Sequence, residues 1–194
     1  MRIVAGRHRG RRIAAPAGLE VRPTADRTRE ALFNILEHGL AKADGTSPLL
    51  GARVLDAFAG SGALGLEALS RGATHATFMD DHAAARSAIR ANAEALGERA
   101  HVAVLPADAA APPPVGAPCD IAFLDPPYRS GLGPQALGAL AARGWLVDGA
   151  ICSIEMAAGD RFAPPAGFIV LDERRYGKAK LILLRYDAPK SPSR

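Results

Sequence analysis

The sequence contains only two cysteines, Cys119 and Cys152, and its five histidines form no ligand pair. Two cysteines cannot build a disulfide framework, and their separation is not that of a zinc site. Both lie in apolar, strand-like runs, where a free cysteine usually serves as a small buried hydrophobic residue. We therefore expect a reducing, cytoplasmic setting, no metal, and cysteines that act only in packing.

The sequence also has no long hydrophobic run. No apolar stretch approaches the roughly 20 residues that a membrane span needs, and the basic N-terminal residues lack the apolar segment of a secretory signal. What is present is a chain of 194 residues, 48% hydrophobic and 23% charged. These values predict one domain over residues 1–194 with a substantial core and no membrane partner, and we expect a monomer.

Positive charge is concentrated near the N-terminus. Residues 1–30 hold eight arginines and three acids, a net charge of +5, whereas the whole chain carries +4. Arginine suits bidentate contact with phosphate, so this segment can serve as a footprint for nucleic acid. A solvated, solubilising end is the alternative, and the charge alone does not decide between the two.

The hydrophobic pattern of the central region alternates between strands and helices. The expected strands cover residues 53–57, 75–79, 101–105, 120–124 and 150–155, and the expected helices cover 62–71, 82–96 and 134–143. Such alternation is typical of βαβ units. It predicts an α/β, Rossmann-like fold with a mostly parallel, doubly wound sheet.

Both ends of the chain depart from this alternation. Residues 1–21 are expected to form a basic hairpin extension of the domain, with residues 7–10 at its turn. A helix is expected over residues 25–42, with Thr24 as its N-cap. Near the C-terminus, two apolar runs flank residues 176–177, which predicts an antiparallel hairpin at one edge of the sheet.

A glycine-rich loop, Gly60-Ser61-Gly62-Ala63-Leu64-Gly65, follows the first expected strand. It satisfies the GxGxxG pattern of dinucleotide sites, a weak signal when it stands alone. In those sites the first glycine directly follows the strand, whereas here Asp56 and three further residues intervene. A carboxylate at this point would repel a pyrophosphate and attract an ammonium group. The stretch resembles the first motif of class I S-adenosylmethionine-dependent methyltransferases, in which Asp56 would act on the cofactor's ammonium group directly, or through loop amides and water.

Acids also follow the next two expected strands. Asp80 and Asp81 lie about 20 residues beyond the glycine loop, where an acid accepts hydrogen bonds from ribose hydroxyls. Asp108 follows the third strand, where methyltransferases of this class commonly hold the adenine amino group; a helix N-cap is the alternative. Successive parallel strands end at one edge of the sheet, so these acids face one crevice. The candidate residues for binding S-adenosylmethionine are Asp56, Phe58, Ala59, Gly60, Gly62, Asp80, Asp81, Asp108 and Ala109.

The fourth expected strand ends in Asp125-Pro126-Pro127-Tyr128, which resembles the signature of methyltransferases that act on exocyclic amines of nucleobases. Such an amine is a weak nucleophile because its lone pair is delocalised into the ring. The Asp125 carboxylate and the Pro126 carbonyl would each accept one N–H bond, and the prolines would hold both acceptors rigid. Tyr128 would stack on the extruded base. An ordinary turn with a core tyrosine is the alternative.

Three stretches in this order resemble the RsmD family, which are bacterial 16S ribosomal RNA guanine-N2 methyltransferases of the small subunit. They are residues 22–36 (RPTADRTREALFNIL), 54–73 (VLDAFAGSGALGLEALSRGA) and 120–128 (DIAFLDPPY). The resemblance implies a class I methyltransferase fold preceded by a basic hairpin. One departure is Asp80-Asp81-His82, where the family more often has a glutamate followed by a basic residue.

The resemblance also gives the N-terminal region a role. It implies that Thr24, Arg27 and Asn34 lie beside the cofactor, although Arg27 and Glu30 are equally spaced for a surface ion pair. A catalytic domain of this length leaves no space for a separate DNA-recognition domain, whereas folded ribosomal RNA needs less base readout and more phosphate contact. The candidate RNA-binding residues are Arg7, Arg9, Arg11, Arg12 and Arg22.

Three alternatives remain beside RNA amino-methylation. Methylation of adenine or cytosine amines in DNA or another RNA would use the same chemistry. An NAD-dependent oxidoreductase would rest on the literal GxGxxG alone and leave residues 125–128 without a task. A non-enzymatic ribosome-binding module would have no need of the acids, the glycines and the aromatic residue. Only an amino-methyltransferase uses every motif.

Overall fold

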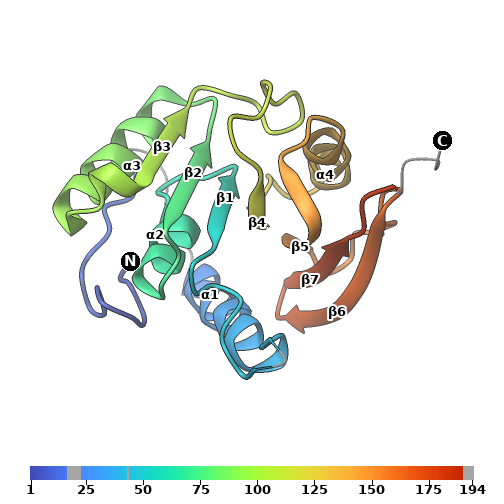
Figure 1. Cartoon of the computed structure of the whole chain (residues 1–194), viewed down its shortest axis with the longest axis horizontal. Coiled ribbons are helices and arrows are strands. Elements are labelled where there is room, and N and C mark those ends of the chain that lie inside the picture. Colours follow the sequence, from blue (N-terminus) through green and yellow to red (C-terminus); the bar gives the residue numbers. More distant parts are fainter. Residues whose placement is uncertain (17–22, 43, 190–194) are drawn as a thin grey trace.

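The computed structural model describes residues 1–16, 23–42 and 44–189, and its centre is a seven-stranded mixed sheet (Figure 1). The strands lie in the order β3-β2-β1-β4-β5-β7-β6. Their bounds are Arg53–Ala57 (β1), His75–Met79 (β2), Val102–Leu105 (β3), Cys119–Leu124 (β4), Leu146–Ala157 (β5), Phe168–Tyr176 (β6) and Ala179–Tyr186 (β7). The first five strands pair in parallel, and β7 is antiparallel to both β5 and β6. The predicted Rossmann-like sheet with a C-terminal antiparallel hairpin is confirmed.

The register of the parallel strands brings their carboxyl ends to one edge of the sheet. Ala57 of β1 pairs with Met79 of β2 and with Leu124 of β4, and Met79 pairs with Leu105 of β3. The loops that follow these residues therefore leave the sheet side by side. In open α/β sheets this edge is where ligands bind.

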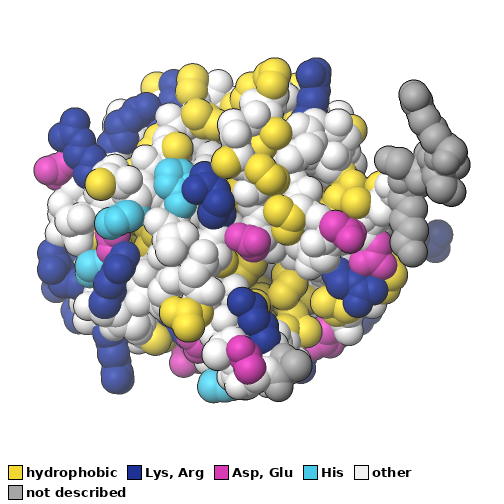
Figure 2. Space-filling view, viewed as in Figure 1, with side chains coloured by type: hydrophobic (Ala, Val, Ile, Leu, Met, Phe, Trp, Pro, Cys, Tyr) yellow, Lys and Arg dark blue, Asp and Glu magenta, His cyan; other side chains and the backbone are white. Residues whose placement is uncertain are grey.

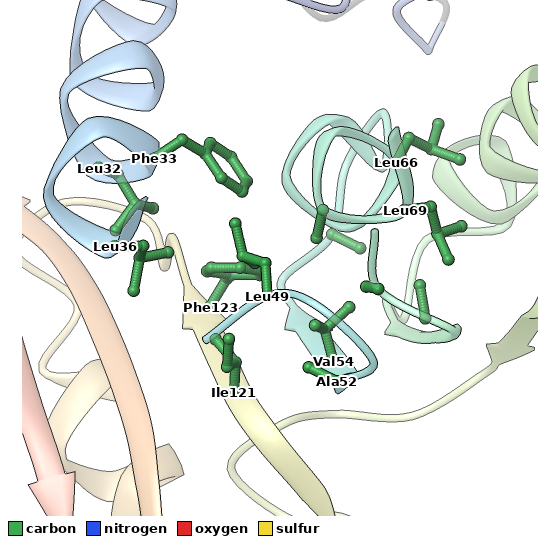
Figure 3. Packing of buried hydrophobic residues seen from close by; sticks show 14 of the residues in the cluster. Leu32, Phe33, Leu36, Leu49, Ala52, Val54, Leu66, Leu69, Ile121 and Phe123 are labelled. Carbon is green, nitrogen blue, oxygen red and sulfur yellow. The ribbon is translucent and has the colours of Figure 1, made fainter. Parts of the chain in front are cut away.

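Helices cover both faces of the sheet (Figure 1). Their bounds are Pro23–Asn34 (α1), Ala63–Ser70 (α2), Ala83–Leu96 (α3) and Leu132–Ala142 (α4), with a π-helical turn at Ile35–Gly39 and a 3₁₀ turn at Arg99–His101. The first three helices pack in one apolar cluster, and α4 packs in another on the opposite face. In Figure 3, Phe33 of α1 lies near Phe123 of β4, and their ring centroids are 5.6 Å apart.

Some boundaries differ from the prediction. The first helix begins at Pro23, so Thr24 lies within its first turn and is not its N-cap. Proline suits this position because its fixed φ is helical and its missing N–H has no partner there. The helix also leaves α-geometry at Ile35 instead of continuing to Lys42. At the C-terminal hairpin, the two strands are joined by Gly177-Lys178.

The N-terminal segment folds as a short hairpin against α2 and α3. Arg2 and Arg12 form an antiparallel bridge, and the Ile3 amide donates to the Arg11 carbonyl at 3.0 Å. Gly6, at φ +79°, lies so close to α2 that an added Cβ would be 1.9 Å from the Ser70 carbonyl oxygen. Glycine is therefore required for the hairpin to approach the helix.

Both cysteines are free and fully buried, which confirms their expected packing role. Burial raises the pKa of Cys119 to about 11 and raises the pKa of Cys152 as well. Neither thiol therefore supplies a thiolate nucleophile at neutral pH. In the described part of the chain, every helix is too short or too polar to cross a bilayer.

Candidate active site

A cleft of about 1410 Å³ opens at the carboxyl edge of the sheet. Its walls come from the loops after β1 to β4, the end of β5, the turn between β6 and β7, and the N-terminal segment. The predicted site residues that line it are Phe58, Gly60, Asp80, Asp81, Asp108, Ala109, Asp125, Pro126, Pro127 and Tyr128. The structure thus brings the predicted cofactor residues and the predicted acceptor corner into one space.

Asp56 does not line this cleft. Its side chain is 1% exposed, and one carboxylate oxygen accepts a hydrogen bond from the Gly65 amide at 2.8 Å. Burial raises the pKa of this carboxyl well above its ordinary value; the Gly65 hydrogen bond opposes that effect, and the charges of Asp125 and Asp80 add to it. Of the two roles expected for Asp56, the geometry supports only the indirect one, in which the carboxylate shapes the loop at the start of α2.

The glycine loop is held in a tight, partly left-handed path. Phe58 has a φ of 63°, which is uncommon for a residue other than glycine. The Gly62 amide donates to the Ala59 carbonyl at 2.7 Å, and this hydrogen bond closes a turn within the loop. Ala59 and Gly62 are not among the residues that line the cleft, and their contact with the cofactor stays a prediction. A Cβ on Gly65 would lie 2.4 Å from the Phe78 ring, so this glycine lets α2 approach the sheet.

Asp80 is the better placed of the two carboxylates after β2. Its oxygens accept hydrogen bonds from the amides of Gly60 at 2.8 Å and His82 at 2.9 Å, which fixes the side chain beside the glycine loop. The Asp80 side chain is 10% exposed, whereas that of Asp81 is 69% exposed. A carboxylate offers about four lone-pair sites, so Asp80 can still accept hydrogen bonds from a ribose.

Asp80, Asp81 and His82 also lie close enough together to share a cation, since their ligand atoms fall within 4.8 Å of one another. Two of these side chains are exposed, and the Asp80 oxygens already accept two amide hydrogen bonds. Exposed acids that cluster in this way commonly bind no ion. The cluster gives no reason to assign a metal.

Asp108 is exposed and is not a helix N-cap, because the chain passes from β3 to β4 without an intervening helix. One of its carboxylate oxygens accepts a hydrogen bond from the Ala110 amide at 2.8 Å, which stabilises a turn. Beside it, Ala109 is buried and packs in the cluster that contains α4. The side chain is thereby held at the rim of the cleft, where it can accept a hydrogen bond from an amino group.

The corner after β4 presents its polar groups to the cleft. Asp125 is exposed, while Pro126 is buried and anchors the turn. Tyr128 is 37% exposed, so it is not a core residue, and its hydroxyl donates to a Glu155 carboxylate oxygen at 2.6 Å. The ring is therefore tied to the end of β5 with part of its surface open. Arg129 follows with a φ of 61°.

The N-terminal segment forms one wall of the cleft through Met1, Ala15 and Pro16. The Met1 sulfur lies 3.4 Å from the Ser61 hydroxyl in the glycine loop. Asn92 of α3 joins the two: its carboxamide accepts from the Ala14 amide, and donates to the carbonyls of Ala14 at 2.9 Å and Ser61 at 3.0 Å. The Asn92 side chain thus binds both the N-terminal hairpin and the glycine loop.

A buried acid, Glu67 of α2, anchors the other end of the hairpin. It is 0% exposed and accepts hydrogen bonds from the amides of Val4 at 2.8 Å and Ala5 at 3.0 Å. It also pairs with Arg71 one turn further on, at 2.8 Å, and Arg71 in turn contacts Glu37. The carboxylate therefore satisfies two backbone donors and one buried cation.

The predicted RNA-binding arginines have different environments. Arg7 pairs with Glu98 at 2.6 Å, and Arg11 donates to the Ala95 carbonyl, so both help to hold the hairpin. Arg9 and Arg12 are exposed. In Figure 2, lysine and arginine side chains gather at the left margin, over α3 and the N-terminal segment. Arg22 lies outside the described residues.

Glu98 is the centre of the hairpin's second anchor. Burial alone would raise the pKa of this carboxyl, but the hydrogen bond from His8, the charge of Arg7 and the hydrogen bond from His101 outweigh it and hold the pKa below the ordinary value. The acid is consequently charged at neutral pH and binds the hairpin through both Arg7 and His8.

Some predicted site residues do not line the cleft, and some lining residues were not predicted. Arg27 and Asn34 are exposed and do not line the cleft, and the side chain of Thr24 lies outside the described part of the structure. The missed lining residue of greatest interest is Glu155. An acid near the end of the strand after the Asp125 corner was a signal that could have found it, by the same reasoning as for Asp80 and Asp108.

Comparisons with known proteins identify one family of relatives. The family model described as "Conserved hypothetical protein 95" matches residues 1–185. A protein from Escherichia coli named "Ribosomal RNA small subunit methyltransferase D" is 40% identical over 156 residues, covering 80% of this chain and 74% of the relative. A protein of the same name from Haemophilus influenzae is 33% identical over 181 residues, covering 91% of this chain and 89% of the relative.

A solved structure from Escherichia coli, described as the methyltransferase yhhF, superposes with a TM-score of 0.81. It is 35% identical in sequence, and the match covers 97% of this chain and 99% of that one. The literal GxGxxG is therefore part of a methyltransferase loop, and the oxidoreductase interpretation is not supported.

Proposed function

The chain belongs to the family described as "Conserved hypothetical protein 95", the RsmD-type methyltransferases, and from this membership we propose that it transfers a methyl group from S-adenosylmethionine to the N2 amine of a guanine in 16S ribosomal RNA. Residues 1–194 would act as a single methyltransferase domain with residues 1–21 as a basic extension. The names of the relatives support ribosomal RNA as the substrate, and the residues of the cleft support methyl transfer to an amine.

The observation that carries the proposal is the position of Asp125 next to the glycine loop. Ala57 and Leu124 are paired neighbours on β1 and β4, so the loop that starts at Phe58 and the corner that starts at Asp125 leave the sheet together. A methyl donor held by the glycine loop would lie beside an amine held by the corner at Asp125. Holding two reactants in this way removes much of the entropic barrier to transfer.

The described residues offer suitable partners for S-adenosylmethionine. Asp80 would accept hydrogen bonds from the ribose hydroxyls, and Asp108 from the adenine amino group. The backbone around Gly60, shaped by buried Asp56, would face the amino-acid part. When bound, the cofactor supplies an activated methyl group on a sulfonium, so the protein does not need to activate the donor.

On the acceptor side, the chain's task is to orient a poor nucleophile. The Asp125 carboxylate would accept one N–H of the guanine amine, and the Pro126 carbonyl would accept the other. Both acceptors are held by a rigid double proline. Tyr128, fixed by Glu155, would stack on the base, an interaction worth roughly 1–3 kcal/mol. The amine proton can leave late in the reaction, so no strong base is required.

The test is methyl transfer to small ribosomal subunits from cells that lack the corresponding gene. The purified protein is incubated with methyl-labelled S-adenosylmethionine, and the RNA is digested to nucleosides. Label in N2-methylguanosine supports the full proposal. Label in N6-methyladenosine or N4-methylcytidine would retain the chemistry and reject guanine. Absence of label, from protein that binds the cofactor, would reject the subunit as acceptor.

A further inference from the structure

We propose that Arg129 and Lys178 form a phosphate-binding rim on the acceptor side of the cleft, which holds the backbone of the RNA strand that carries the target base. Arg129 comes from the loop after β4, and Lys178 from the turn between β6 and β7. Both line the cleft and both are exposed. The inference rests on the proposed RNA substrate and adds a contact surface separate from the N-terminal hairpin.

The first argument is electrostatic. The acceptor side of the cleft carries two acids, Asp125 and Glu155, and both line its wall. A polyanion would be repelled by these carboxylates at distances shorter than the Debye length, which is about 8 Å at physiological salt. A strand that brings a base to this side of the cleft is therefore favoured by cations that face its phosphates. Among the described residues, Arg129 and Lys178 are the arginine and lysine side chains that line the cleft.

The second argument is that these two cations are not used within the protein. Several other arginines are paired with acids: Arg7 with Glu98, Arg71 with Glu67, and Arg174 with Asp172. Within residues 1–16, 23–42 and 44–189, by contrast, neither Arg129 nor Lys178 makes a side-chain ion pair or hydrogen bond. Their charges therefore face solvent at the mouth of the cleft.

The third argument is the backbone of Arg129. Its φ of 61° is a left-handed conformation that glycine adopts without strain and arginine does not. Two residues later the chain does use glycine, at Gly131 with a φ of 71°. Strained, non-glycine positions of this kind cluster at functional sites. The arginine side chain at this position thus has a use that outweighs the strain.

The turn that carries Lys178 is tied to the same site. The Lys178 carbonyl accepts a hydrogen bond from the Ala158 amide at 2.8 Å, just beyond the end of β5. Glu155, which holds the Tyr128 hydroxyl, lies on that same strand. The two cations consequently come from two elements that meet at this site: Arg129 follows Tyr128 in the chain, and Lys178 lies in the turn bonded just beyond the end of β5. This arrangement suits one strand with a phosphate on either side of an extruded nucleotide.

The experiment measures salt dependence. Binding of a fluorescein-labelled single-stranded RNA oligonucleotide is followed by anisotropy over a range of KCl concentrations. Each lost phosphate contact should reduce the slope of log K against log salt by about 0.7, so Arg129→Gln and Lys178→Gln should each lose about 0.7 and the double variant about 1.4. Arg143→Gln, which removes an exposed arginine at the far end of α4, is the matched control and should keep the wild-type slope.

A further variant separates binding from folding. Arg129→Gly relieves the left-handed strain, so its thermal midpoint should not fall, whereas its salt slope should drop as in Arg129→Gln. Cofactor affinity, measured by calorimetry, should be unchanged in all variants. If the wild-type protein binds the RNA and methylates small subunits, but the double variant keeps the wild-type salt slope, the phosphate-binding rim is refuted and the proposed function is not. Wild-type protein that binds neither the oligonucleotide nor the subunit would overturn both the rim and the proposed function.

Discussion

Replacing Glu67 with glutamine should destabilise the protein far more than replacing an exposed acid. The Glu67 carboxylate is fully buried and accepts from the amides of Val4 and Ala5 and from the Arg71 guanidinium. Glutamine has nearly the same volume, but its NH₂ group must face one of these donors. Arg71, whose side chain is 3% exposed, would keep Glu37 as its only acidic partner among the described residues.

The magnitude follows from these contacts. Removing one partner of a buried, hydrogen-bonded ion pair typically costs about 3–5 kcal/mol; here three buried donors lose a charged acceptor and one of them must face the glutamine NH₂ group, although Arg71 keeps Glu37. In a chain of this size each kcal/mol lowers the thermal midpoint by about 2–4 °C, so Glu67→Gln should lower it by roughly 6–20 °C. The free energy of unfolding in urea, at pH 7, is the second measurement.

Glu94→Gln is the matched control. Glu94 also pairs with an arginine, Arg99, but both side chains are largely exposed, at 64% and 84%. Surface pairs contribute about 0–1 kcal/mol, so the control should stay close to wild type. Glu67→Gln should also weaken cofactor binding, because the hairpin that it anchors forms a wall of the cleft. A loss of stability no greater than in Glu94→Gln would refute the anchoring role.

Four further outcomes are expected. Asp125→Ala should lower kcat by at least about 100-fold, because the amine loses an oriented acceptor, while calorimetry shows unchanged cofactor affinity; retained turnover would contradict its role. Asp56→Asn should raise the thermal midpoint at pH 7, because the raised pKa of this buried carboxyl makes its ionisation costly to the fold. The gain should shrink as the pH falls toward the ordinary pKa of 3.8 and vanish well below it, where the carboxyl is protonated in both states. Glu98→Gln should cost about 1–3 kcal/mol at pH 7. Since the Glu98 pKa is lowered by folding, the difference from wild type should shrink as the pH falls below 4.5, and a difference that stays constant as the pH is lowered would refute the linkage. Replacing Arg9 and Arg12 with glutamine should reduce the salt slope of subunit binding by about 1–2 without changing cofactor affinity; an unchanged slope would remove the hairpin from the RNA interface.

The sequence was most informative where chemistry and topology coincide. Parallel strands that are buried on both faces read as continuous apolar runs, so the residues that end them could be located. The acids at Asp80, Asp108 and Asp125 follow directly from that reading, and the cleft brings all three together. A resemblance to known motifs then supplied their roles.

What the sequence could not provide was long-range pairing. Nothing local marks Glu67, Asn92 or Glu98 as anchors, because their partners lie 63, 78 and 90 residues away. The sequence left open whether Asp56 acts directly or through the loop, because its burial depends on how α2 packs on the sheet; the structure buries it beneath the loop. In the sequence, Arg7 and Arg11 cannot be distinguished from the exposed arginines beside them. The fold is needed to show that Arg7 pairs with Glu98 and that Arg11 donates to the Ala95 carbonyl.

The separation between the hairpin and its anchors also constrains how the protein matures during translation. The hairpin leaves the ribosome first, but Glu67, Asn92 and Glu98 are synthesised 63 to 90 residues later. At about 5–20 residues per second, the segment waits several seconds for the helices on which it docks. Throughout that interval a nascent chain with exposed arginines lies beside ribosomal RNA. The wall formed by Met1, Ala15 and Pro16 is therefore completed late, and the cleft itself, whose lining extends to Ala179, forms later still.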